Sequence, residues 1–352
     1  MPKDFHEHTF AEWGQQHGDV VLHTTYWKNA ERIIQADHVF LPYESYAYAA
    51  HFHRFASAII LEVIYGHSVT TDDDEFMLRA REAVTAAAHA GSPGSTLVDV
   101  FPLLKHYPTW LPGSNFKVSG NHIRRIRDIM VDLPYNMVKS QMELGNYPTS
   151  FTASLLETYA LDGSLTLEDE EYIKGSAATF LGGMMNASSG TDTVSSAMTT
   201  FILAMVRHPH VFKKAQEEID SVVNSNRLPQ LDDRNSLPYL DCIIKEVYRG
   251  ISREAERYPE PSAFNPERYM NGTEDLDPKT YIFGFGRRIC PGQYYADSSI
   301  FLVAANILAT MNISMAKDEA GIAIIPPLEF VSGISTYVCS PSVRIRTLTS
   351  WQ

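Results

Sequence analysis

The sequence contains few cysteines, and their spacing excludes two common kinds of cysteine-rich protein. Only Cys242, Cys290 and Cys339 occur among the 352 residues. No two of them form a CxxC pair, and three widely separated thiols do not build a disulfide framework or a zinc site. We therefore expect reduced thiols and a location that faces the cytosol.

Long apolar runs and an excess of basic residues are also absent. No uncharged apolar segment approaches the ~20 residues needed to cross a bilayer, and the polar N-terminus does not resemble a signal peptide. Lysine and arginine total 29 against 42 acidic residues, so the net charge of -13 argues against nucleic acid as the main partner. With 44% hydrophobic residues, we expect a folded protein that is soluble or at most peripherally bound to a membrane.

The spacing of apolar residues predicts a mainly α-helical protein with minor β-structure. Thr166 and Asp169 match a capping box, and the apolar segment that follows predicts a helix on the order of 50 Å long. Residues 91–114 are interpreted as a connector that either rests on a membrane surface or packs on the body of the protein. Helices are predicted over about 50–66, 170–207, 211–223, 239–249 and 292–311, and strands over 321–325 and 342–346.

The most informative segment, residues 283–292, reads FGFGRRICPG. Its internal glycines permit a tight loop, and Pro291 suits the first position of a helix. A thiol at Cys290 then faces unpaired backbone N–H groups and the positive end of the helix dipole, both of which stabilise a thiolate. Phe283 supplies a flat apolar ring, and the guanidinium group of Arg288 can make two parallel hydrogen bonds to a carboxylate.

Three other interpretations of this segment compete with a thiolate site. A dinucleotide-binding loop needs glycine three positions after Gly286, where Ile289 stands. A phosphatase-type loop needs arginine six positions after the cysteine, where Ala296 stands. Most free cysteines are simply buried in the core, and this stays an alternative for Cys290. It does not explain the neighbouring phenylalanine, glycines and arginine.

The segment resembles the haem-binding signature F-x-x-G-x-R-x-C-x-G of cytochromes P-450 and matches every fixed position. The resemblance implies haem b as cofactor, with Cys290 as the thiolate ligand of the iron. It implies that Arg288 pairs with a haem propionate and that Phe283 shields the sulfur. Gly286 and Gly292 are implied to let the loop and the helix approach the porphyrin.

Two further motifs occur in the order that this family has. Glu246 and Arg249 resemble its E-x-x-R pair, and the segment FNPERY at 264–269 resembles its F-x-P-E-R-F. Alone, an i, i+3 pair indicates only a solvated ion pair on a helix. The resemblance implies instead that Glu246, Arg249 and Arg268 form a buried network that fixes the chain leading to the cysteine.

The long predicted helix carries SGTDTV at 189–194, which resembles the family's A/G-G-x-D/E-T-T/S motif. The resemblance places it over the distal face of the haem, where Asp192 and Thr193 relay protons during oxygen activation. Val194 departs from the usual second hydroxyl. The alternative is that the hydroxyls only bond back to helix carbonyls.

Two segments of the family pattern are missing. The W-x-x-x-R motif, which the resemblance implies binds a haem propionate, does not occur in this sequence. The helix that would carry it is missing near residues 39–50. Arg249-Gly250 runs directly into Ile251, where the resemblance implies an extended, strand-rich segment. We therefore expect one truncated cytochrome P-450-type domain over residues 1–352, with gaps near 39–50 and at 249–251.

The resemblance extends to fungal microsomal members of the family, including enzymes of secondary metabolism. It implies a monooxygenase that inserts one oxygen atom from O2 into a small apolar organic substrate. A separate NADPH-dependent reductase is implied to supply electrons at the cytosolic face of the endoplasmic reticulum membrane, although this chain shows no transmembrane anchor. The alternative is a haem-binding or non-functional truncated remnant without turnover, because the gaps remove propionate and substrate contacts.

Overall fold

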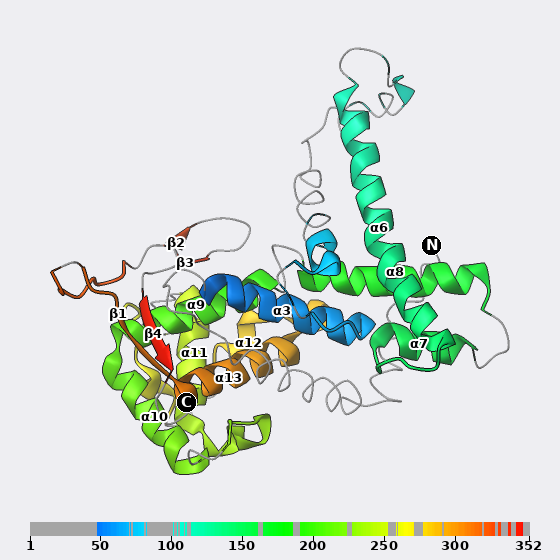
Figure 1. The fold of residues 1–352 in the computed structure, drawn as a ribbon. Coiled ribbons are helices and arrows are strands. Elements are labelled where there is room, and N and C mark those ends of the chain that lie inside the picture. Colours follow the sequence, from blue (N-terminus) through cyan, green and yellow to red (C-terminus); the bar gives the residue numbers. More distant parts are fainter. Residues whose placement is uncertain are drawn as a thin grey trace. The chain divides into compact units, whose positions relative to one another are not determined.

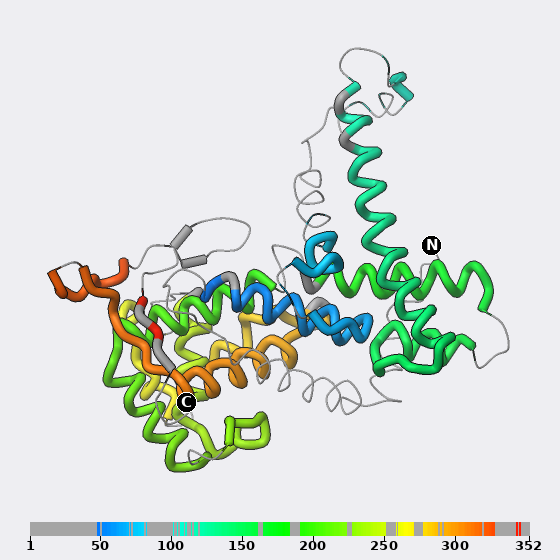
Figure 2. The backbone as a smooth tube through the Cα atoms, viewed as in Figure 1, coloured from blue at the N-terminus to red at the C-terminus, as the bar shows by residue number. Residues whose placement is uncertain are grey.

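The computed structural model divides into two compact units, which are described separately. Within the described residues, the first unit holds 57–185 and the second holds 48–56 and 191–347. Figure 2 follows the backbone of both units. The structure describes residues 48–69, 71, 73–80, 82, 101, 104, 106–108, 110, 114–160, 165–185, 191–223, 227–252, 258, 260–270, 277–290, 292–318, 320–327, 330–331, 337–338 and 343–347.

Helices α6, α7 and α8 pack against one another in the first unit, together with the second half of α3 (Figure 1). The second half of α3 is rich in apolar residues, and Ile59, Ile60 and Ile64 are completely buried. The hydroxyl of Thr152 on α7 donates to the carbonyl of Ile64 at 2.8 Å and ties the two helices together. The bounds are α3 Tyr48–Tyr65, α6 Asn115–Glu143, α7 Phe151–Ala160 and α8 Leu167–Met185.

The second unit is built around helix α13, which packs against α9, α10 and α11. The described side chains of α13 from Ser299 to Thr310 are all buried, which gives this unit its core. Its helices are α9 Thr191–Arg207, α10 Pro209–Val223, α11 Pro238–Ser252, α12 Lys279–Ile282 and α13 Gln293–Thr310, and its 3-10 turns are η3 Leu231–Ser236, η4 Pro266–Tyr269 and η6 Gly286–Arg288.

Short antiparallel strands complete the second unit. Strand β1 (Met311–Met315) pairs with β4 (Val343–Thr347), so that Met311 lies opposite Thr347. Strand β2 (Phe330–Val331) pairs with β3 (Tyr337–Val338). The alternating burial of β1 places Met311 and Ile313 against the core, and Figure 1 shows β1 and β4 side by side.

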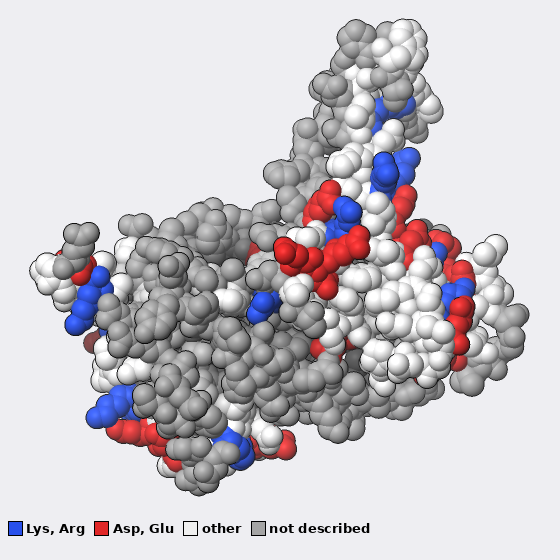
Figure 3. Space-filling view, in the orientation of Figure 1, with Lys and Arg blue, Asp and Glu red and all other residues white. Residues whose placement is uncertain are grey.

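Helix α6 is long but polar. Figure 3 shows lysine and arginine side chains along it, and it continues through Pro134 to Glu143. None of the helices in the described ranges has both the length and the apolar character that a bilayer span requires. In the connector before α6, the side chains of Phe101 and Trp110 are exposed.

Most predicted elements have counterparts in the structure. Helices α3, α10, α11 and α13 lie where helices were predicted, and the capping box is present, since the Asp169 N–H donates to Thr166 Oγ1 at 3.2 Å. The predicted helix over 170–207 corresponds to α8 and α9, with residues 186–190 outside the described part.

One predicted strand was wrong, one predicted helix ended one residue too late, and three helices were not predicted. Met311 begins β1 instead of ending a helix, because the residues after it alternate between buried and exposed. Residues 321–325 form no named strand, and only Ala323 makes an isolated bridge, to Lys317. Helices α6 and α7 and the four-residue helix α12 were missed. The prediction of one truncated domain with two gaps stays a prediction.

Candidate functional site

The backbone of the loop before Cys290 closes on itself. Gly284 has a φ of 81° and Gly286 a φ of 59°, which are left-handed conformations that favour glycine. The N–H of Ile289 donates to the Gly286 carbonyl at 3.1 Å, and the N–H of Cys290 donates to the Phe283 carbonyl at 2.7 Å. The two ends of the segment 283–290 are therefore joined by a hydrogen bond, as the sequence motif predicts for a tight loop.

Cys290 stands at the entrance to helix α13. The Gln293 N–H donates to the Cys290 carbonyl at 3.3 Å, and Gly292 is the N-cap. A Cβ on Gly292 would lie 3.8 Å from the Cys290 sulfur, so the sulfur lies beside the first turn of the helix. The positive end of the helix dipole is there. The thiol is partly exposed, so it is not a cysteine buried in the core.

The loop that ends at Cys290 carries several large apolar side chains. The ring of Phe283 meets the ring of Tyr248 edge-on, with 6.0 Å between centroids. Phe285 is 71% exposed and Ile289 43% exposed, which is unusual for large apolar side chains in one loop. The backbone of Arg288 lies in η6, but its side chain is outside the described part of the structure.

These residues fit a haem. The donor is a single accessible thiol at a helix entrance, and the neighbouring exposed side chains Phe285 and Ile289 are apolar, as an apolar porphyrin face requires. A Cβ placed on Gly286 would meet no atom within 4 Å, so the loop borders open space. The sequence motif and the local geometry therefore agree.

Glu246, Arg249 and Arg268 lie together inside the second unit. Glu246 is completely buried, and its carboxylate accepts from Arg249 Nη2 at 2.8 Å and Nε at 2.9 Å. Arg268 Nε lies 3.1 Å from the same carboxylate. The side chains of the two arginines are 4% and 9% exposed, so the interpretation as a solvated ion pair is wrong.

This network also holds part of the chain that precedes the loop 283–290. Arg249 donates to the carbonyls of Pro261 and Ala263 at 2.9 and 3.1 Å. The N–H of Asn265 donates to Glu246 Oε1 at 3.0 Å. Residues 261–265 have no helix or strand of their own, so these bonds satisfy backbone groups that would otherwise lack partners.

Asp192 and Thr193 lie in the first turn of α9. Asp192 Oδ1 is 3.1 Å from Nε2 of His53 on α3, and both side chains are partly exposed. Thr193 is exposed, whereas Val194 is buried. Back-bonding to helix carbonyls occurs in this helix at Thr199, whose hydroxyl donates to the Ser195 carbonyl at 2.8 Å. It stays an alternative for the hydroxyl of Thr193.

Sequence reasoning did not select His53. It lies 139 residues from Asp192, and nothing in the local pattern of α3 marks its side chain as the partner of an acid. Only the packing of α3 beside the start of α9 brings the two together within the second unit.

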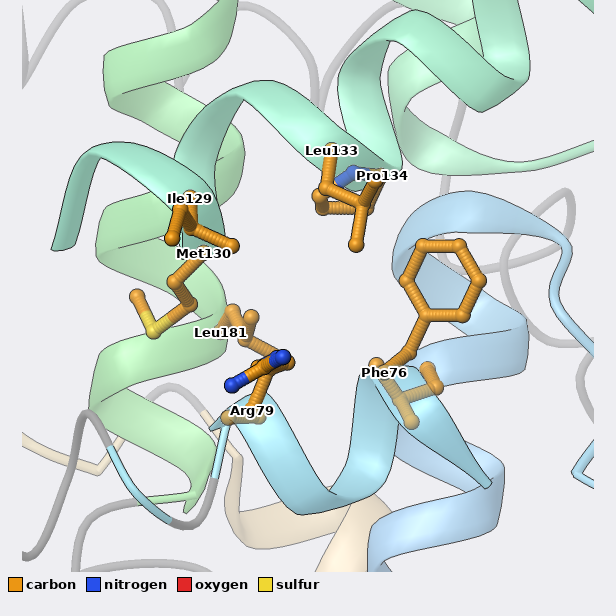
Figure 4. Close-up of a pocket in the computed structure, with 9 residues that line it drawn as sticks. Phe76, Arg79, Ile129, Met130, Leu133, Pro134 and Leu181 are labelled. Carbon is orange, nitrogen blue, oxygen red and sulfur yellow. The ribbon is translucent and has the colours of Figure 1, made fainter. Parts of the chain in front are cut away.

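A small apolar pocket lies elsewhere, in the first unit (Figure 4). It is enclosed by α3, α6, α8 and the turn of helix at residues 75–80. Arg79 borders it and pairs with Glu82 at 3.2 Å. None of the predicted site residues lines this pocket, so it is separate from the candidate haem site. Its apolar lining includes Leu61, Phe76, Ile129, Met130, Leu133 and Leu181.

Comparison with known proteins agrees with the sequence motifs. The family model described as Cytochrome P450 matches residues 42–252 and 248–339. The two matches meet where α11 ends, which is the place where the sequence lacks the expected strand-rich segment.

Curated relatives of this chain include fungal proteins. Cytochrome P450 monooxygenase 176 of Postia placenta is 39% identical over 330 residues, which cover 83% of this chain and 62% of the relative. Cytochrome P450 monooxygenase 136 of the same fungus is 40% identical over 319 residues, with 80% and 59% covered. The chain therefore spans about three fifths of the length of these relatives.

The fold is also found among solved structures. A zebrafish cytochrome P450, in a structure with abiraterone, aligns with a TM-score of 0.67 at 20% identity. The alignment covers 94% of this chain and 78% of the zebrafish chain. The prediction of a mainly α-helical fold of this type is confirmed.

Proposed function

Because the chain belongs to the cytochrome P450 family, we propose that it binds haem b through Cys290 and acts as a monooxygenase on a small apolar organic substrate. The observation that carries this proposal is the closed loop that presents one accessible thiol at the entrance to α13. Bound haem supplies the redox chemistry that inserts one atom of O2 into the substrate and reduces the other to water.

The residues of the loop have separate parts in holding the cofactor. Cys290 provides the thiolate, and Phe283, braced against Tyr248, covers the sulfur with an apolar ring. Gly286 and Gly292 leave room for the porphyrin because neither has a side chain. Arg288 is assigned to a propionate by its position in the motif.

Asp192 and Thr193 are assigned to proton delivery. The imidazole Nε2 of His53 lies 3.1 Å from the Asp192 carboxylate. His53 therefore holds the carboxylate in place at the start of α9. Electrons come from a separate NADPH-dependent reductase, at the endoplasmic reticulum surface, as the family resemblance implies.

The second candidate function is haem binding without turnover. It is favoured by the junction at residues 249–251, where the resemblance implies a strand-rich segment that this sequence lacks. The absence of W-x-x-x-R removes a propionate contact that the family uses. Both candidates require Cys290 as ligand, so they differ only in whether NADPH is consumed with a reductase present.

The test of the ligand is a reduced carbon monoxide difference spectrum of the purified chain. A thiolate ligand gives a red-shifted Soret band, which Cys290→Ser is expected to abolish. Cys242→Ser and Cys339→Ser serve as controls and are expected to keep the band. Loss of the band in either control, with retention in Cys290→Ser, would show that another cysteine binds the iron.

A further inference from the structure

The second unit contains a cluster of charged side chains that belongs to none of the motifs above. It joins η3, α11 and α13 to the short helix α12 and to Asp277, two residues before that helix. Three cations alternate with three anions, so the cluster is neutral as a whole. Its members, named here the α12 charge cluster, are Arg234, Asp241, Lys245, Asp277, Lys279 and Asp297.

Four of these side chains form a closed ring of ion pairs. Lys279 Nζ lies 3.3 Å from Asp241 and 3.1 Å from Asp297. Arg234 Nη2 lies 2.7 Å from Asp241 and 2.9 Å from Asp297. Each cation therefore contacts both carboxylates, and no side chain of the ring is more than 25% exposed.

The ring is electrostatically strong for a group that is not fully buried. Burial by itself raises the pKa of Asp241, but Lys279 and Arg234 outweigh it and lower the pKa to about 2. Asp241 also contacts Lys245, which in turn lies 3.0 Å from Asp277. Networks of this kind are worth more than isolated surface pairs, because each charge is held by more than one partner.

The position of the ring relates it to the thiol. Lys279 opens α12, which ends directly before Phe283, and Asp297 lies on α13, which begins after Cys290. The Lys279–Asp297 pair therefore joins the two flanks of the loop 283–290. Tyr248 strengthens this link, since its hydroxyl donates to Asp297 at 3.1 Å while its ring packs on Phe283.

We infer that Lys279 and Asp297 are positioning residues for Cys290, whose sulfur they hold at the entrance to α13 by fixing both flanks of its loop. What the sulfur binds rests on the proposed function, but its placement is a property of the protein alone. The bonds of the Glu246 network described above hold residues 261–268, which are a different part of the chain.

The experiment compares Lys279→Met and Asp297→Asn with wild type and with Lys174→Met. Lys174 is the matched control: it is 16% exposed, pairs with Asp132 at 2.9 Å and lies in the first unit. The first measurement is the rate at which an aromatic disulfide reagent modifies Cys290, followed by mass spectrometry of its peptide. The second is the fraction of red-shifted band in the reduced carbon monoxide spectrum.

Both cluster variants are expected to raise the modification rate of Cys290 by roughly threefold or more, a modest change for residues coupled in one network. They are also expected to lose part of the red-shifted band. Lys279→Arg is expected to restore both readouts, and Lys174→Met to leave both unchanged at equal folded fraction. The thiol measurement needs no haem, so a wild type without the red-shifted band overturns the proposed function and leaves this test intact.

Three results overturn the inference. The first is a Cys290 rate in Lys279→Met and Asp297→Asn that equals that of Lys174→Met. The second is a raised rate that Lys279→Arg does not reduce. If neither cluster variant folds, the cluster is a folding element, and the positioning role is rejected on that ground.

Discussion

The substitution Glu246→Ala tests the buried network most directly. In wild type the Glu246 carboxylate is completely buried and contacts Arg249, Arg268 and the N–H of Asn265. The substitution removes the carboxylate that two guanidinium groups share, and these side chains are only 4% and 9% exposed. Removing one partner of a buried ion pair costs ~3–5 kcal/mol. Because a domain has only about 5–15 kcal/mol of stability, we expect insoluble or haem-free protein.

The measurement is the free energy of unfolding from urea titration, followed by circular dichroism. Glu267→Gln is the control on the same segment, since Glu267 pairs with Lys214 at 2.9 Å with both side chains about half exposed. An exposed pair of this kind is worth about 0–1 kcal/mol. Equal stabilities of the Glu246→Ala and Glu267→Gln variants, with haem retained in both, would refute the reasoning from burial.

Three further predictions concern proton delivery, haem retention and acid stability. Thr193→Ala is expected to keep the carbon monoxide spectrum and to raise the amount of peroxide formed per NADPH consumed. An unchanged ratio removes Thr193 from the mechanism. If the wild type consumes no NADPH, the second candidate function, haem binding without turnover, is favoured. Haem is expected to pass to apomyoglobin faster than from a full-length relative, because W-x-x-x-R is absent; retention through extensive dialysis contradicts this. The pKa of Asp241 is lowered from 3.8 to about 2, so its ionised form stabilises the fold by about 2 kcal/mol above pH 4, and this stabilisation is lost as the pH falls towards 2. In Asp241→Asn the urea midpoint is therefore expected to change less with pH between 4 and 2 than in wild type. An equal pH dependence in the two proteins would contradict this.

The thiol loop could be predicted from the sequence because its determinants are local. Glycines at 284 and 286 set the backbone, and the entrance to α13 follows within the same segment. The E-x-x-R pair was also recognisable, although its spacing alone gave no sign of burial. Burial depends on residues 261–268 folding back over α11, which a local pattern does not encode.

The contacts that could not be predicted join distant parts of the chain. His53 and Asp192 are 139 residues apart, and Lys279 and Asp297 are separated by the whole loop and a helix entrance. Charged residues on a helix ordinarily indicate a solvated face, so Asp241 and Asp297 carried no signal of their own. Helix α6 was missed for a related reason, because its polar sequence and Pro134 weaken the apolar periodicity on which the prediction depended.

The bonds from Arg249 to the backbone have a consequence for how the chain tolerates change. The planar guanidinium reaches the Glu246 carboxylate and the carbonyls of Pro261 and Ala263 at once. For residues 261–263 it does what a neighbouring strand does in a sheet, in that it supplies N–H donors in fixed directions. A lysine at 249 would keep the positive charge but would lack the planar array of N–H donors. It could therefore pair with Glu246 without holding residues 261–263 in place.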